Sequence, residues 1–170
     1  MQRVAFKPVA REDARVLILG SLPGEESLRL GEYYGKKTNR FWWIMGELVG
    51  ASPDMAYADR LDRLRQHHIA VWDVCASAYR AGSLDKNILT PSVVPNDFAA
   101  FLAAHPQIAL IGFNGRPAEK LFRDLVLSTL PAAAATIPRA VLPSTSPAHA
   151  SMPPTAKLAL WRETLGGVIG

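Results

Sequence analysis

The chain has one cysteine, Cys75, among 170 residues. A single cysteine excludes an internal disulfide, a cysteine-ligated iron–sulfur cluster and any zinc site that needs several thiolates. The flanking residues, from Trp72 to Ala76, supply no adjacent base that would activate the thiol. We therefore interpret Cys75 as a small buried hydrophobic residue rather than as a nucleophile.

Several longer patterns are also missing. No stretch approaches the roughly 20 apolar residues that span a bilayer, and residues 1–7 lack the apolar core of a signal peptide. Neither a Walker phosphate loop nor a G-x-G-x-x-G dinucleotide fingerprint occurs, and no spacing of His, Asp and Glu indicates a metal site. We expect a cytoplasmic protein without membrane contact, and we predict neither a metal nor a cofactor.

The overall composition is that of a folded domain. Hydrophobic residues make up 49% of the chain and charged residues 20%. This length suits one domain, and we expect it to span residues 1–170. The net charge of +4 favours an acidic partner, with nucleic acid as the first candidate.

Short apolar runs alternate with amphipathic stretches along the chain. The apolar runs predict four strands, at residues 15–19, 69–72, 107–112 and 139–142. The amphipathic stretches predict helices at residues 40–49, 56–67, 97–104, 116–127 and 154–165. We interpret residues 76–95 as a long irregular segment and residues 130–138 as an alanine-rich connector. This alternation predicts an α/β fold, a three-layer α/β/α sandwich around a four-stranded parallel sheet.

Three of these strands are followed by small and polar residues. The three loops are Gly20-Ser21-Leu22-Pro23-Gly24, Asn114-Gly115 and Pro143-Ser144-Thr145-Ser146-Pro147. Ligands of open α/β sheets bind beyond the carboxyl ends of the parallel strands. We therefore expect these loops to form one site, which offers amides, hydroxyls and backbone N–H groups.

Aromatic and cationic residues are interleaved between Tyr33 and Trp43. This mixture suits base stacking combined with phosphate neutralisation. The alternative is that Phe41 and its tryptophan neighbours begin an amphipathic helix and fill the core. Asn39 is either the N-cap of that helix or a polar site residue, and the local sequence leaves both roles open.

A set of short blocks then occurs in a fixed order: Gly20 to Gly24, Tyr34-x4-Asn39-Arg40-Phe41-Trp42, Trp72 to Cys75, Arg80 to Ile88, Phe113-Asn114-Gly115 and Leu142 to Ala148. Together they resemble the uracil-DNA glycosylase superfamily, and most closely its hypoxanthine-DNA glycosylase branch. The matching blocks extend over residues 15–150. The resemblance implies that the Gly20–Gly24 turn lies against a flipped base, that Phe41 stacks on it, and that residues 143–148 wedge into the duplex.

The chain also departs from the uracil-specific pattern. Leu22 stands where those enzymes carry the Asn or Asp that activates water, and Leu142 stands where the most efficient ones carry His. Both changes fit the hypoxanthine branch, in which the Asn of the Tyr-x4-Asn block serves catalysis. The resemblance thus implies that Asn39 is the catalytic residue.

The remaining candidates follow from the resemblance, from the irregular segment 76–95 or from a place near the strand ends. For base contact we predict Gly20, Ser21, Leu22, Phe41, Ser77 and Asn114. For DNA contact we predict Arg80, Arg116, Ser144, Thr145, Ser146, Pro147, Ala148 and His149. Asp73 and Asp85 are candidates for water activation, with loop organisation or N-capping as the alternative.

Together these observations predict a hydrolase, a monofunctional DNA glycosylase of base excision repair. It would flip out and remove a deaminated base, with hypoxanthine first and uracil or xanthine as further candidates. We expect a monomer whose partner is DNA that contains such bases. One alternative is a non-catalytic sensor that binds flipped bases, and another is a hydrolase of free nucleosides.

Overall fold

Four parallel strands form the central sheet of the computed structural model, which describes residues 1–169. In sheet order they are β3 (Ile69–Asp73), β2 (Val16–Gly20), β6 (Leu110–Asn114) and β7 (Arg139–Leu142). Every neighbouring pair is parallel, which confirms the predicted sheet. β2 and β3 are buried along their whole length, as strands covered on both faces must be.

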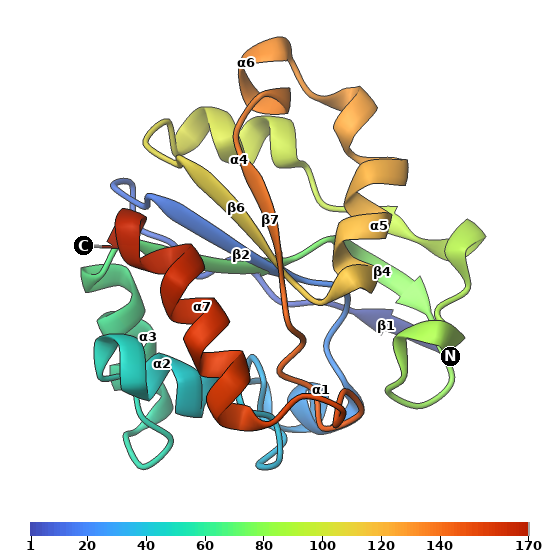
Figure 1. The fold of residues 1–170 in the computed structure, drawn as a ribbon. Helices are drawn as coiled ribbons and strands as arrows, with labels where there is room; N and C mark the ends of the chain where they lie inside the picture. The colour runs from blue at the N-terminus through green and yellow to red at the C-terminus, as the bar shows by residue number, and fades with distance from the viewer. Residues whose placement is uncertain (170) are drawn as a thin grey trace.

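Helices cover both faces of this sheet, so the molecule has the predicted three layers (Figure 1). On one face lie α2 (Phe41–Val49), α3 (Tyr57–Gln66) and α7 (Pro154–Ile169). On the other face lie α4 (Phe98–Ala104), α5 (Arg116–Leu125) and the short α6 (Ala132–Ala135). Side chains of β2 alternate between the two faces, because successive residues of a strand point in opposite directions. Val16 and Ile18 pack into one core cluster, and Leu17 and Leu19 pack into the other.

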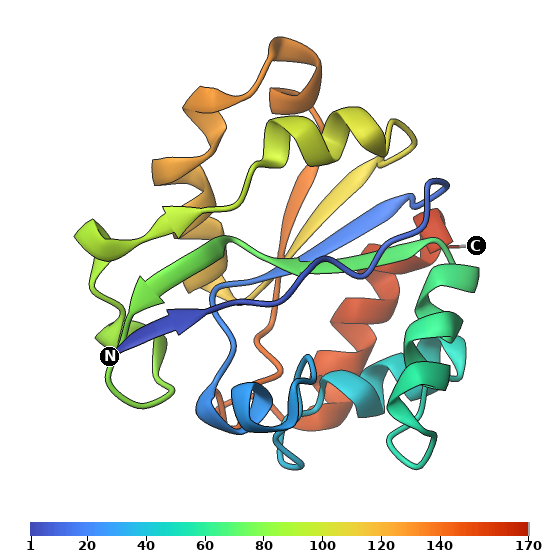
Figure 2. The same cartoon turned by 180° about the vertical axis from the view of Figure 1, so that it is seen from behind.

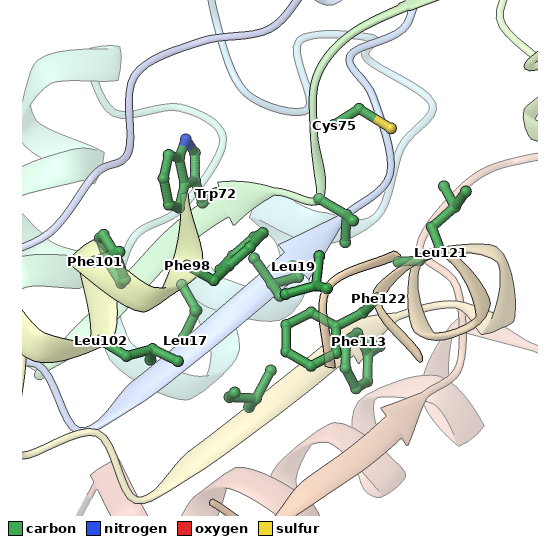
Figure 3. Packing of buried hydrophobic residues seen from close by; sticks show 14 of the residues in the cluster. Leu17, Leu19, Trp72, Cys75, Phe98, Phe101, Leu102, Phe113, Leu121 and Phe122 are labelled. Carbon is green, nitrogen blue, oxygen red and sulfur yellow. The ribbon is translucent and has the colours of Figure 1, made fainter. Parts of the chain in front are cut away.

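The cluster between the sheet and α4 and α5 is rich in aromatic rings (Figure 3). The Trp72 and Phe98 ring centroids lie 5.0 Å apart, and those of Phe98 and Phe122 lie 5.4 Å apart. Fully burying one such side chain contributes about 1.5–3 kcal/mol. Cys75 is buried in this cluster, and burial raises the pKa of its thiol to about 12. This environment fits its interpretation as a small hydrophobic residue.

A second, antiparallel sheet was not expected from the sequence. It consists of β1 (Gln2–Val4), β4 (Cys75–Tyr79) and β5 (Val94–Pro95), which lie side by side at one end of the molecule (Figure 2). The interpretation of residues 76–95 as irregular was therefore wrong for the two strands in it. Two 3-10 turns, η1 (Asp85–Asn87) and η2 (Thr90–Ser92), lie between these strands. The ladder pairs β4 with β1, more than seventy residues earlier in the chain, and no local pattern reveals such a partner.

Other boundaries differ from the prediction for local reasons. β6 starts later than residue 107, because the Ile108 N–H bonds back to the His105 carbonyl in a turn. A short helix, α1 (Glu25–Leu30), follows the first strand-end loop, and a 3-10 turn, η3 (Leu127–Thr129), precedes α6. α7 continues through Gly166 and Gly167 to Ile169, beyond the predicted end at residue 165.

The order of the strands decides where a ligand can bind. From β2 the chain passes to β3 on one side, and it later returns to β6 on the other side of β2. The carboxyl ends of β2 and β6 therefore form a topological switch point, where α/β sheets leave a crevice between diverging connections.

Candidate active site

A cavity of about 630 Å³ lies at the carboxyl ends of the parallel strands. Its walls come from every strand end of the central sheet: Gly20 to Gly24 after β2, Asp73 of β3, Asn114 of β6 and Ser144 to Ala148 after β7. Tyr34, Lys36 and Asn39 complete the wall between α1 and α2. The three strand-end loops thus surround one space, whose size is within the usual range for small-ligand sites.

The Gly20–Gly24 turn is held from behind by Arg80. The Arg80 guanidinium donates to the carbonyls of Leu22, Pro23 and Gly82, and only 1% of the residue is exposed. Arg80 was predicted as a phosphate ligand, and this was wrong because all its donors point into the protein. It instead fixes the backbone that presents Gly20, Ser21 and Leu22 to the cavity.

Tyr34 occupies the face of Phe41 that was expected to receive a base. The two rings stack with centroids 4.1 Å apart and an interplanar angle of 22°. Phe41 is completely buried and does not line the cavity, whereas Tyr34 does. Tyr34 also has a φ of +53°, a strained conformation for an aromatic residue that often accompanies functional sites. The Tyr34 ring is therefore the aromatic surface available to a ligand, a role that the sequence analysis did not assign.

Asn39 is a polar residue of the site, whereas the N-cap of α2 is Arg40. The Asn39 side-chain oxygen accepts a hydrogen bond of 2.9 Å from the Phe41 N–H, so it holds the first residue of α2 from the position before the N-cap. It also lines the cavity. Within residues 1–169 its side-chain NH2 group forms no hydrogen bond, so this donor is available to a ligand.

Asn114 and Thr145 form a closed pair at the opposite wall. The Asn114 oxygen accepts from the Thr145 N–H at 2.9 Å, and the Asn114 NH2 donates to the Thr145 hydroxyl at 2.9 Å. Asn114 lines the cavity as predicted. Its amide is already committed, however, to holding the loop that follows β7.

That loop, residues 143–149, is fixed at its base and open at its tip. Trp161 of α7 donates from its ring N–H to the Pro143 carbonyl at 2.9 Å, and Lys157 donates to the His149 carbonyl at 2.6 Å. Thr145 is completely buried, whereas Pro147 and Ala148 are exposed at the rim of the cavity. The loop can therefore meet a large partner without losing its anchors.

Besides Phe41 and Arg80, three further predicted site residues do not line the cavity. Ser77 lies on β4, where it pairs with Val4 and Val94, and it does not line the cavity. Arg116 is exposed and lines a separate groove between α5 and the Asp85–Thr90 segment. His149 is half-buried beside α7, and its carbonyl anchors the loop. The strand β4 turns away from the cavity after Asp73, which the sequence did not reveal.

Asp73 and Asp85 are two of the four carboxyl groups that line the cavity, with Glu25 and Glu26. Asp73 is 4% exposed, and burial raises its pKa from 3.8 to about 7. Asp85 accepts a hydrogen bond of 2.6 Å from the Ser21 hydroxyl and lies 3.9 Å from the Arg80 guanidinium. Within residues 1–169, no three His, Cys, Asp or Glu side chains lie close enough to hold a metal ion, and no helix is long and apolar enough to cross a membrane.

Comparison with known proteins places this chain in a family. The family model described as the uracil DNA glycosylase superfamily matches residues 7–165. A hypoxanthine DNA glycosylase of Methanosarcina acetivorans is 38% identical over 153 residues, which cover 88% of this chain and 89% of the relative. A hypoxanthine DNA glycosylase of Methanosarcina barkeri is 36% identical over 117 residues, covering 68% of this chain and 73% of the relative.

A solved structure agrees with these matches. It is a solution NMR structure of a protein from Methanosarcina acetivorans described as a candidate uracil DNA glycosylase. The TM-score is 0.76 at 34% identity, and the match covers 96% of this chain and 98% of the other. The chain belongs to the uracil DNA glycosylase superfamily, which confirms the resemblance and the fold class inferred from the sequence.

Proposed function

We propose that this protein is a monofunctional DNA glycosylase that hydrolyses the N-glycosidic bond of a deaminated base in DNA and leaves an abasic site. The base is hypoxanthine in the first place, with uracil and xanthine as further candidates. The observation that carries the proposal is the cavity at the switch point of the sheet, with the exposed Pro147-Ala148 tip at its rim. The names of the Methanosarcina relatives support the choice of hypoxanthine.

The shape of the site suits a base that has left the duplex. Chemistry on a base requires that it be unstacked, which costs a few kcal/mol and least for a poorly paired base. The cavity offers the Tyr34 ring for stacking and polar groups for the base edges. Lys36 and Arg40 are exposed beside this opening, and their positive charge favours the DNA backbone.

Within this proposal, Asn39 is the catalytic residue. Loss of the base gives the sugar oxocarbenium character and places negative charge on the base. The unpartnered NH2 group of Asn39 can donate to that base, and its oxygen keeps one lone pair for a water after accepting from the Phe41 N–H. A preorganised donor of this kind is typically worth about 3–4 kcal/mol in the transition state.

A lyase activity is not part of the proposal. Lyase chemistry needs an amine nucleophile, and such lysines are activated by a desolvated site or a neighbouring cation. The one lysine among the residues that line the cavity, Lys36, is exposed to solvent. Water is therefore the nucleophile that we assign.

The direct test is a base-excision assay. Matched duplex and single-stranded oligonucleotides would carry one deoxyinosine, deoxyuridine or deoxyxanthosine, and abasic sites would be detected as strand breaks after alkali. We expect breaks with deoxyinosine that require the alkali step. Tight binding to deoxyinosine DNA without product would replace the proposal by the alternative of a non-catalytic sensor. Turnover of free inosine without action on DNA would replace it by a nucleoside hydrolase.

Asn39 can be tested by two variants that separate its two roles. Asn39→Ala removes both the hydrogen bond to the Phe41 N–H and the NH2 group, whereas Asn39→Asp keeps an oxygen for the Phe41 N–H and loses the NH2 group. We expect both variants to lose most of the excision rate. Only Asn39→Ala should lose stability, by about 1 kcal/mol, the usual contribution of one hydrogen bond. Wild-type turnover in a folded Asn39→Asp protein would contradict the role of the NH2 group.

A further inference from the structure

Asp73 is a buried acid without a partner for one of its oxygens. It is the last residue of β3, only 4% of it is exposed, and it lines the cavity. Its Oδ2 and the hydroxyl of Tyr34 are buried, and neither has a hydrogen-bond partner among residues 1–169. Because buried polar groups are nearly always hydrogen-bonded, these two oxygens indicate a ligand that supplies the missing partners.

Gly20 leaves room for both the Asp73 carboxyl group and the Tyr34 hydroxyl beside the strand. A Cβ at Gly20 would lie 2.6 Å from the Asp73 Oδ1 and 3.0 Å from the Tyr34 hydroxyl. The Asp73 main chain is fixed, since it pairs with Gly20 in the sheet and its carbonyl accepts from the Asn96 side chain at 2.7 Å. The backbone that carries the carboxyl group is therefore fixed at the cavity wall before any ligand arrives.

The charges around Asp73 do not neutralise it. Tyr33 and Tyr34 face it from the segment after α1, Cys75 from β4, and Arg80 and Asp85 from the segment after β4. Arg80 directs its donors to backbone carbonyls, and its ion pair is with Asp85. Burial, with a smaller contribution from Asp85, raises the pKa of Asp73 to about 7, against an opposing effect of Arg80. The protonated acid is thus present at neutral pH.

We propose that Asp73 donates a proton to the base as the base leaves the sugar. In this step the C1′–N9 bond breaks and its electron pair passes to the purine ring. The carboxyl O–H bond also breaks, and its proton goes to a ring nitrogen, so that the base leaves neutral. Water then adds to C1′ and releases a proton, which restores the acid. This inference rests on the proposed glycosylase function.

Asp73 would supply what Asn39 cannot. An amide can donate a hydrogen bond to the departing base, but it cannot transfer a proton at ordinary pH. General acid catalysis by a positioned side chain contributes about 10²–10⁴-fold, and it is most effective when the pKa lies near the working pH. A buried carboxylic acid beside the cavity meets both conditions.

The test is the pH dependence of single-turnover excision on a duplex with one deoxyinosine. We expect the wild-type rate to be level at low pH and to fall about tenfold per pH unit well above pH 7, as the acid is lost. Asp73→Asn should be slower by about 10²-fold or more and should lack this fall. Asp59→Asn, which changes an exposed acid of α3, is the matched control and should follow the wild type.

Binding distinguishes proton transfer from simple base contact. Duplexes with non-cleavable 2′-fluoro-2′-deoxyinosine should bind wild type and Asp73→Asn within a few-fold of each other. The proposed role of Asp73 would be overturned if Asp73→Asn lost DNA binding as strongly as it loses the excision rate. It would also be overturned if the fall in rate at alkaline pH persisted in Asp73→Asn. Neither result would affect the proposed glycosylase function. A level wild-type profile from about pH 6 to pH 9 would overturn the role of Asp73 without any variant. A wild type inactive on every deaminated base would overturn the proposed function itself.

Discussion

The side-chain amide of Asn114 is bonded at both ends to one residue, Thr145. It accepts from the Thr145 backbone N–H and donates to the Thr145 hydroxyl, each at 2.9 Å. These two bonds join the carboxyl end of β6 to the loop after β7, across 31 positions of sequence. These two bonds therefore tie the wall of the cavity to the base of the loop at residues 143–149.

This pair predicts how the loop responds to substitution. Asn114→Ala removes both bonds, and since a hydrogen bond contributes about 1 kcal/mol, we expect a loss of about 2–3 kcal/mol of unfolding free energy. Thr145→Val keeps the N–H bond and should lose less. Denaturant unfolding measures the difference. Hydrogen exchange at the Thr145 N–H should accelerate only in Asn114→Ala, and equal exchange in both variants would argue against the closed pair.

The close packing around Gly20 predicts that any larger residue at this position would clash with its neighbours. In Gly20→Ala the new Cβ would lie 2.6 Å from the Asp73 carboxyl, so either the strand or the acid must move. We expect a loss of about 1–3 kcal/mol in stability together with weaker excision. Gly166→Ala is the matched control: nothing lies within 4 Å of its Cβ position in α7, and alanine should stabilise that helix by about 0.5–1 kcal/mol. Equal stability of the two variants would contradict the close approach at Gly20.

We predict that the buried guanidinium of Arg80 contributes strongly to the stability of the protein. Arg80→Met leaves the buried carbonyls of Leu22 and Pro23 without their donors, and we expect a loss of about 2–4 kcal/mol. Arg80→Lys keeps the charge but cannot reach these carbonyls and that of Gly82 together, so it should rescue little. Arg116→Ala, at an exposed position, should stay within about 0.5 kcal/mol of the wild type in urea unfolding. An Arg80→Met protein as stable as Arg116→Ala would show that the turn does not depend on the guanidinium.

Asp73 predicts a dependence of stability on pH. Its pKa is about 7 in the folded protein and 3.8 for an unperturbed aspartate, so at intermediate pH the folded state holds a proton that the unfolded chain has released. Stability contributed by this group is therefore complete below about pH 4 and is lost as the pH rises to about 7, by about 4 kcal/mol in total. Asp73→Asn lacks this loss. The unfolding free energy of Asp73→Asn should therefore rise relative to that of the wild type between about pH 4 and pH 7. If the two proteins showed parallel profiles of unfolding free energy against pH, the raised pKa of Asp73 would be contradicted.

The sequence identified the loops that form the site, but it did not predict how their side chains are arranged. The strand-end loops after β2, β6 and β7 were found because small and polar residues directly follow buried apolar runs, and parallel strands end at one edge. Arg80 could not be placed, since a buried arginine and a surface arginine look alike in sequence. Likewise, nothing local indicated that Tyr34 would cover Phe41, because the stack depends on how the loop before α2 turns back.

Periodicity by itself predicted the three layers and the parallel sheet, and the ordered short motifs carried the resemblance to the uracil DNA glycosylase superfamily. These properties depend on residues that are close together in the sequence, because burial of one or both faces of a helix or strand dictates its pattern of apolar side chains. Only the tertiary structure decided which side chains are committed to the protein and which remain open to a ligand. That distinction depends on contacts between distant segments, such as Arg80 with the Gly20–Gly24 turn and Asp73 with Tyr34, and on the water that their burial removes.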